Sequence, residues 1–297
     1  MWQLRLRLLL SVCLLGLGTS CIEFDGQTTT FRYDAEQDEL RIFQVYQRIH
    51  ADGEQGRLTD AERKQLATVV GGQRTFFFAN WITDYSREAT RNEIEKLRQQ
   101  LAAAEPADRE PIQAQLDFRQ ELQRSVDVVN GHFFLNQQQQ LCGYQQVVVR
   151  NVTRLLELAS RWIRLAVEAD ALEGYDDAAR QAIRQFIADG GNWIELDGNQ
   201  LTIRYFTTPE QYAVQEKSQR LFTADGKPAF AGKLAYDAPF AVLTIGSPDA
   251  AMTTLQVDNL RNGSYNSLVL DEVRQKHDVL ERLNLDRIRD DFLKSAD

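Results

Sequence analysis

WIELDGNQLTIRYF, residues 193–206, is the stretch that decides the fold. Its two halves are rich in β-branched, aromatic and aliphatic residues, and the Asp197-Gly198 pair lies between them. An Asp-Gly pair is typical of the tight type I′ turn that joins two antiparallel strands. The segment therefore predicts a β-hairpin with strands over 193–196 and 200–206.

Two other parts of the chain have the same organisation. Residues 27–49 hold two β-prone runs on either side of a polar turn at 34–38. Residues 126–135 and 141–150 are a second such pair, with the polar turn 136–139 between them. Hairpins between helices favour an antiparallel sheet over a doubly wound parallel one. The sequence therefore predicts an α+β fold, with antiparallel hairpins packed against several helices.

Residues 86–124 differ from their surroundings because they are highly charged and carry only thin apolar stripes. Ile94 and Leu97 belong to the first stripe, and Pro111 suits the first turn of a second helix. We expect a helical-hairpin insertion in a single α+β domain of residues 21–297. Such a hairpin either projects from the body as a contact device or packs flat against it.

An aromatic segment precedes this hairpin. Thr59 and Glu62 match a capping box, which predicts a helix beginning there, and Gly71-Gly72 should end it. The aromatic residues crowded into 76–85 are then predicted to form a further, buried helical patch.

The first 21 residues have the features of an export signal. Arg5 and Arg7 give a positive start, and residues 8–18 form an apolar run of 11 residues broken only by a serine. A signal peptide needs an apolar run of ~7–15 residues, whereas a membrane-spanning helix needs ~20. Small residues then lead into Cys21, which resembles the lipobox of bacterial lipoproteins. The resemblance implies that residues 1–20 are removed and that the Cys21 thiol carries a diacylglyceryl group.

The same resemblance implies an address. In that family the new N-terminal cysteine usually receives a further acyl chain such as palmitate, and two chains anchor a protein stably. In enterobacterial members an aspartate after the cysteine retains the protein in the inner membrane, whereas Ile22 follows Cys21 here. We therefore expect an outer-membrane lipoprotein of the cell envelope that faces the periplasm. The alternative is an ordinary signal peptide cut near Ser20, which would release an unanchored protein.

The charge of the chain excludes one class of partner. Loss of residues 1–20 removes two arginines and no acid, which changes the net charge from −9 to −11. An acidic chain lacks the basic footprint that nucleic acids require, so no nucleic-acid partner is expected. It gains nothing from anionic lipid surfaces either, so the lipid on Cys21 has to provide the membrane attachment.

Cysteine and histidine are scarce. Cys13 leaves with the signal and Cys21 is lipidated, so Cys142 has no intramolecular disulfide partner. Cys142 is interpreted as a small buried hydrophobe, with a nucleophile or an intermolecular disulfide as the alternative. A nucleophile needs a base, and His132 lies across the predicted 126–150 hairpin. Cys142 and His132 are therefore candidate site residues.

The sequence contains no recognisable catalytic, nucleotide-binding or metal-binding motif, and no cofactor is expected. Residues 51–62 have the length of a calcium loop, but Ala51, Gly53 and Gln55 stand where oxygen ligands are required. Adjacent acids, as at 176–177, do not face one another on a helix and suit a cap better than a catalytic pair.

Three functions remain open at this point. The leading hypothesis is a non-catalytic scaffold or binding module with an envelope protein partner. The second is an envelope hydrolase that uses carboxylates or Cys142. The third is a carrier of an apolar ligand, because Phe76–Phe78, Trp81 and Trp162 could line a cavity rather than fill the core.

Overall fold

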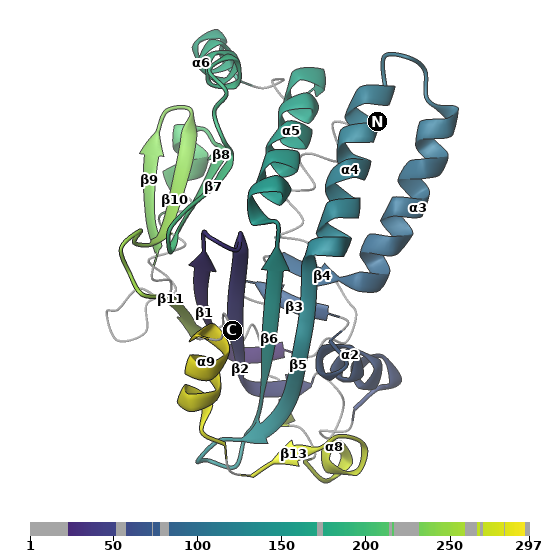
Figure 1. Ribbon diagram of the computed structural model, residues 1–297, viewed down its shortest axis with the longest axis vertical. Helices are drawn as coiled ribbons and strands as arrows, with labels where there is room; N and C mark the ends of the chain where they lie inside the picture. Colours follow the sequence, from purple (N-terminus) through teal and green to yellow (C-terminus); the bar gives the residue numbers. More distant parts are fainter. Residues whose placement is uncertain are drawn as a thin grey trace.

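The fold is α+β, as predicted. The computed structural model describes residues 23–51, 58–72, 74–77, 83–170, 175–213, 216, 232–258, 266–267, 270–281 and 283–294. A main sheet forms one layer, and helices and two smaller sheets pack around it (Figure 1).

Within the described residues the main sheet has seven strands. Its order is β11-β1-β2-β6-β5-β13, with β12 paired to β2; all neighbours are antiparallel except β13 and β5. The strands are β1 (Glu23–Asp34), β2 (Glu39–Ala51), β5 (Val126–Leu135), β6 (Leu141–Arg150), β11 (Thr253–Asp258), β12 (Asn266–Ser267) and β13 (Val279–Leu280).

Two smaller sheets accompany it. The second sheet has the order β7-β8-β10-β9, and a separate hairpin pairs β3 with β4. Their strands are β3 (Arg74–Phe77), β4 (Thr83–Ser86), β7 (Ile194–Asp197), β8 (Gln200–Phe206), β9 (Gly232–Asp237) and β10 (Phe240–Gly246).

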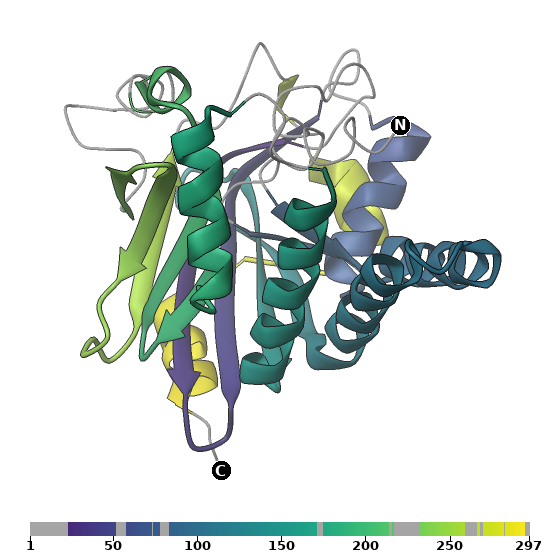
Figure 2. The same ribbon diagram turned by 90° about the horizontal axis from the view of Figure 1, so that it is seen from above.

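Helices α3, α4 and α5 lie side by side and extend beyond one end of the main sheet (Figure 1). Seen from above, the α3–α4 pair points away from the second sheet, and α5 lies between that pair and the second sheet (Figure 2). The helices are α2 (Asp60–Val70), α3 (Arg87–Ala103), α4 (Arg109–Ser125), α5 (Val152–Asp170), α6 (Asp177–Ala188), α8 (Leu270–Lys276) and α9 (Leu285–Lys294).

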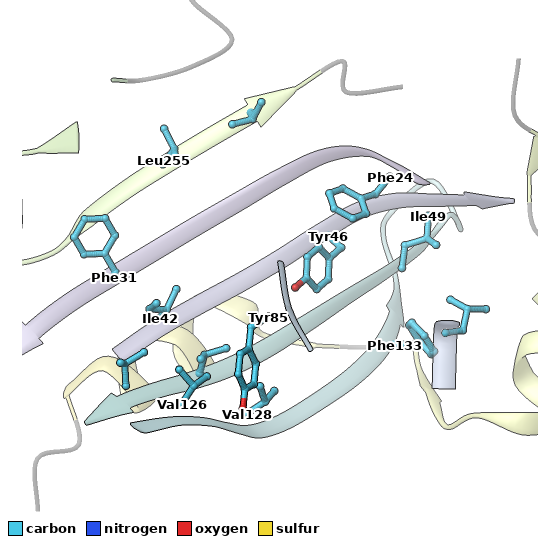
Figure 3. Close-up of a cluster of buried hydrophobic side chains, with 14 of the residues drawn as sticks. Phe24, Phe31, Ile42, Tyr46, Ile49, Tyr85, Val126, Val128, Phe133 and Leu255 are labelled. Carbon is cyan, nitrogen blue, oxygen red and sulfur yellow. The ribbon is translucent and has the colours of Figure 1, made fainter. Parts of the chain in front are cut away.

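The main core lies on the face of the main sheet that we call the core face. Side chains from β1, β2, β5 and β11 gather there, and Tyr85 of β4 joins them (Figure 3). On the opposite face, the outer face, α9 covers a smaller cluster that contains Phe43, Cys142 and Leu293. Because both faces are covered, β6 is buried at nine consecutive positions. A third cluster, built largely of aromatic side chains, joins α5 and α6 to the second sheet.

The two ends of the main sheet differ in what they carry. Because β1, β2, β6 and β5 are antiparallel neighbours, the start of β1, the end of β2 and the turn 136–140 share one end. We call this the cavity end. The turn 35–38, the end of α4 and the start of α5 share the other, which we call the helix end. There the Asp38 carboxylate accepts hydrogen bonds from the N–H (3.0 Å) and hydroxyl (2.9 Å) of Thr153 and so caps α5.

Most predicted elements are confirmed. The hairpins at 27–49, 126–150 and 193–206 are β1–β2, β5–β6 and β7–β8, and residues 86–124 form the α3–α4 helical hairpin. The capping box is present: the Glu62 carboxylate accepts the Thr59 N–H at 2.7 Å.

The helical patch predicted for 76–85 is wrong, because β3 and β4 form an antiparallel pair there. Consecutive phenylalanines favour strands, and the helix had already ended before the Gly71-Gly72 turn. The side chains of Phe76–Phe78 and Trp81 lie outside the described residues.

Candidate functional site

The described chain begins at the cavity end, two positions after the predicted lipidation site. Cys21 lies outside the described residues, and the described chain begins two residues later with Glu23, the first residue of β1. Glu23 pairs with His50 at the end of β2. The start of β1 and the end of β2 therefore lie together at the cavity end.

The main sheet opens at the cavity end because β2 leaves β6. Their ladder ends at the Tyr46–Gly143 pair, although β6 continues to Leu141 alongside β5. Arg48 adopts the left-handed conformation, with φ of 51°, and its N–H donates to Cys142 Sγ at 3.5 Å. This conformation costs a non-glycine residue about 1–2 kcal/mol. The thiol thus occupies the place where β2 turns away.

Arg48 belongs to a partly buried charged group. Its Nε lies 2.9 Å from Asp25 Oδ2, and the other carboxylate oxygen of Asp25 lies 3.3 Å from His50 Nε2. His50 is only 7% exposed. The carboxylate therefore lies between a guanidinium and an imidazole at the very start of β1.

Beside this group the outer face is hollowed. A cavity of about 470 Å³, which we call the Arg48 cavity, has Val45, Phe134, Leu285 and Cys142 as its less polar lining. Its polar lining consists of Gln47, Arg48, Asn136, Gln138 and Gln140. This volume falls within the range of small-molecule sites, ~300–1,000 Å³.

The turn 136–140 is held by its own hydrogen bonds. Asn136 Oδ1 accepts the N–H groups of Gln138 at 3.0 Å and Gln140 at 2.8 Å, and Asn136 Nδ2 donates to Gln140 Oε1 at 2.9 Å. Because the side-chain carbonyl of Gln140 accepts this bond from Asn136, its side-chain NH₂ remains available to donate. The wall of the cavity is therefore ordered by the protein itself.

Cys142 and His132 lie on the same face of the main sheet but do not form a reactive pair. Their strand partners are Phe134 and Tyr144, and the His132 ring packs against Tyr144 with centroids 5.7 Å apart. Burial raises the pKa of the Cys142 thiol, and the nearby Arg48 N–H and charge lower it by less. A nucleophilic cysteine needs a lowered pKa, so this environment suits a structural thiol.

Other sequence candidates have structural partners. Asp176 caps α6 by accepting the Ala179 N–H at 2.7 Å, and Trp162 stacks on Phe118 with ring centroids 5.3 Å apart. An apolar cavity between the core face and α5 measures only about 70 Å³. Within the described residues, no three His, Cys, Asp or Glu side chains converge as metal ligands. None of the helices in the described part of the chain is long and apolar enough to span a membrane.

The sequence did not indicate the Arg48 cavity. Arg48 occurs within a β-prone run, and Asp25 lies two residues before the start of the predicted hairpin. Gln138 and Gln140 were assigned only to a turn. In the sequence, four consecutive glutamines lie close to Cys142. This local pattern does not indicate that the end of β2 packs beside them. Comparison of the chain with protein-family models, with curated proteins and with solved structures finds no match.

Proposed function

We propose that this chain is a cell-envelope lipoprotein, anchored through Cys21 to the outer membrane and facing the periplasm. In this proposal it works as a non-catalytic scaffold or binding module, and its α3–α4 hairpin contacts a protein partner. The lipobox resemblance supports the address, and the placement of the hairpin supports the activity.

The position of the hairpin carries the proposal. Glu23 follows Cys21 by two positions, a span of at most about 7 Å, so the anchor holds the cavity end near the membrane. α4 enters β5 at the helix end, and the α3–α4 hairpin extends beyond that end (Figure 1). Each helix has 17 residues, a length of about 25 Å. The hairpin tip therefore points away from the anchored end.

The hairpin is a firm structure with an open side. Ile94, Leu97, Ile112 and Leu116 form its own buried cluster. The Arg119 guanidinium of α4 joins the Glu93 carboxylate of α3 at 3.0 Å, and α4 packs in turn against α5. Arg91 and Lys96 are exposed on α3 and have no ion pair within the described part of the chain. This side suits a polar, salt-sensitive contact with an acidic partner surface.

The test is chemical cross-linking of the full-length protein in its native membrane. We expect a stoichiometric partner that is lost in Cys21→Ala and strongly reduced in the double variant Arg91→Glu/Lys96→Glu. Arg154→Glu, an exposed site on α5, is the matched control and should retain the partner. Equal cross-linking by the double variant and the control would contradict a contact through α3.

The address has a separate test. Mass spectrometry of the purified protein should find a mature chain that begins at Cys21 and carries acyl chains. An unmodified chain that begins near residue 21 would contradict the anchor. The raised pKa of the Cys142 thiol weighs against a thiol hydrolase.

A further inference from the structure

The polar groups of the Arg48 cavity offer both donors and an acceptor. Asp25 Oδ2 lies 2.9 Å from Nε of Arg48, and the two terminal amino groups of the guanidinium form no hydrogen bond to any residue that the structure describes. Gln140 has its carbonyl tied to Asn136, which leaves its NH₂ to donate. Gln47 uses its NH₂ on Thr28 Oγ1 at 3.3 Å, which leaves its carbonyl to accept.

The position of the cavity in the main sheet adds a second constraint. Because the β2–β6 ladder stops at Tyr46–Gly143 while β6 continues, the cavity opens at a notch where β6 has no neighbour on one side among the described strands. An extended backbone fits such a notch better than a compact group does. Val45, Phe134 and Leu285 supply an apolar surface beside the polar groups.

We propose that the Arg48 cavity binds the free carboxylate end of a short peptide. The guanidinium fork of Arg48 would receive the carboxylate, with help from the Gln140 NH₂, because its two terminal amino groups match the two oxygens. The Gln47 carbonyl would accept the N–H of the last peptide bond. A volume of about 470 Å³ accommodates about three small residues.

The acceptor distinguishes this ligand from a phosphate group. A phosphodiester, as in a lipid headgroup, presents only acceptor oxygens, so the Gln47 carbonyl would be left unmatched against it. The last residue of a peptide presents both a carboxylate and an amide N–H, and both kinds of group find a partner. This proposal goes beyond the hairpin contact and does not depend on it.

The experiment is calorimetric titration of the full-length protein in detergent with two probes. One is N-acetyl-trialanine with a free carboxylate, and the other is the same peptide with a C-terminal amide. We expect saturable binding of the acid and roughly tenfold or weaker binding of the amide, because only the acid forms a charge-assisted pair with Arg48. This comparison needs no variant and so cannot fail through misfolding.

Two variants with opposite expected signs sharpen the test. Arg48→Gln should weaken binding of the acid roughly tenfold or more, because it removes the charged donor. Asp25→Asn should strengthen it roughly twofold to fivefold, because it frees the guanidinium from a competing carboxylate. Arg91→Gln makes the same charge change on α3 and should leave binding unchanged.

Some outcomes would overturn the proposal. Equal affinity for acid and amide, or no binding of either at millimolar concentration, would exclude a carboxylate site. Binding of inorganic phosphate or of anionic lipid vesicles in place of the acid peptide would assign the cavity to another ligand. Because cross-linking through α3 is measured separately, failure here leaves the proposed hairpin contact standing.

Discussion

The two ends of the main sheet are built in opposite ways. At the helix end, hydrogen bonds link the turn 35–38 to the start of α5, and a compact aliphatic cluster holds α3 against α4. At the cavity end the strands separate, Arg48 takes a left-handed backbone conformation, and a carboxylate is shared by a guanidinium and an imidazole. The helix end consists of regular strand and helix contacts, whereas the cavity end has an irregular backbone beside the Arg48 cavity.

The difference shows where binding chemistry can arise in a chain of this composition. Regular pairing uses up backbone and side-chain groups, so the helix end presents mainly the outer surfaces of its helices. Where a ladder stops, donors and acceptors become available beside an apolar wall. We therefore expect substitutions of buried residues at the helix end to affect stability, and substitutions of the polar groups that line the Arg48 cavity to affect ligand binding.

The largest expected effect is a loss of stability in the α3–α4 hairpin at the helix end. Leu97 is buried in the small cluster between α3 and α4, and Leu97→Ala should cost about 2–4 kcal/mol through a cavity that few neighbours can fill. Hydrogen exchange should show lost protection over 87–125, while β2 and β6 keep theirs. Equal loss throughout the chain would mean that the hairpin and the sheet unfold as one unit.

The next effect concerns the cap at the same end. Asp38 accepts from Thr153 and also from the Tyr33 hydroxyl at 2.9 Å, and its own φ is 51°. Asp38→Ala should therefore lower the free energy of unfolding by about 2 kcal/mol, measured by urea denaturation. Asp38→Asn keeps a side-chain oxygen and tolerates the left-handed conformation, so it should lose less. Equal losses in the two variants would point to the charge alone.

A gain in stability is expected at the cavity end. Gln139 has a φ of 59° in the turn 136–140, and its side chain is exposed. Gln139→Gly should raise the free energy of unfolding by about 0.5–1 kcal/mol, because glycine adopts this conformation without strain. The neighbouring Gln138→Gly is the control and should not stabilise, since Gln138 has no positive φ. Stabilisation by both would show that the turn is limited by something other than backbone strain.

The smallest effect is a pH dependence at Cys142. Burial raises the pKa of its thiol in the folded state, so folding favours the protonated form. The resulting stability is fully present below the ordinary thiol pKa, roughly 8.5, and is lost as pH rises through the folded-state value. Stability relative to Cys142→Ala should therefore fall above that pH. A flat difference between wild type and variant would show that the thiolate is tolerated in place.

Regular elements could be predicted from sequence because alternation and turn residues are local. The strands β5 and β6 begin and end at the predicted residues, and the capping box places the start of α2. Gln44 and Gln145 could not be placed, since both are fully buried on the core face although their polarity suggests exposure. Their amides bond to Gln27, Thr29 and Tyr46 across strands. Such partners exist only once the sheet has formed.

The site was not predictable for the same reason. Asp25, Arg48 and Cys142 come together through the pairing of β1 with β2 and of β2 with β6, and no local pattern links them. The left-handed backbone conformation of Arg48 could not be predicted from sequence either, because glycine, asparagine and aspartate are the residues that usually adopt it.

The pairing of β1 with β11 governs the order in which the molecule can form. Strand 23–34 meets strand 253–258, and α9 lies over β2, where Arg32 and Arg41 donate to the carbonyls of Leu293 and Phe292. The first strand therefore keeps an open edge until residues 253–258 have been synthesised. Contacts so distant in sequence slow folding. Until then β1 has an unpaired edge, which is the kind of surface through which partly formed sheets aggregate.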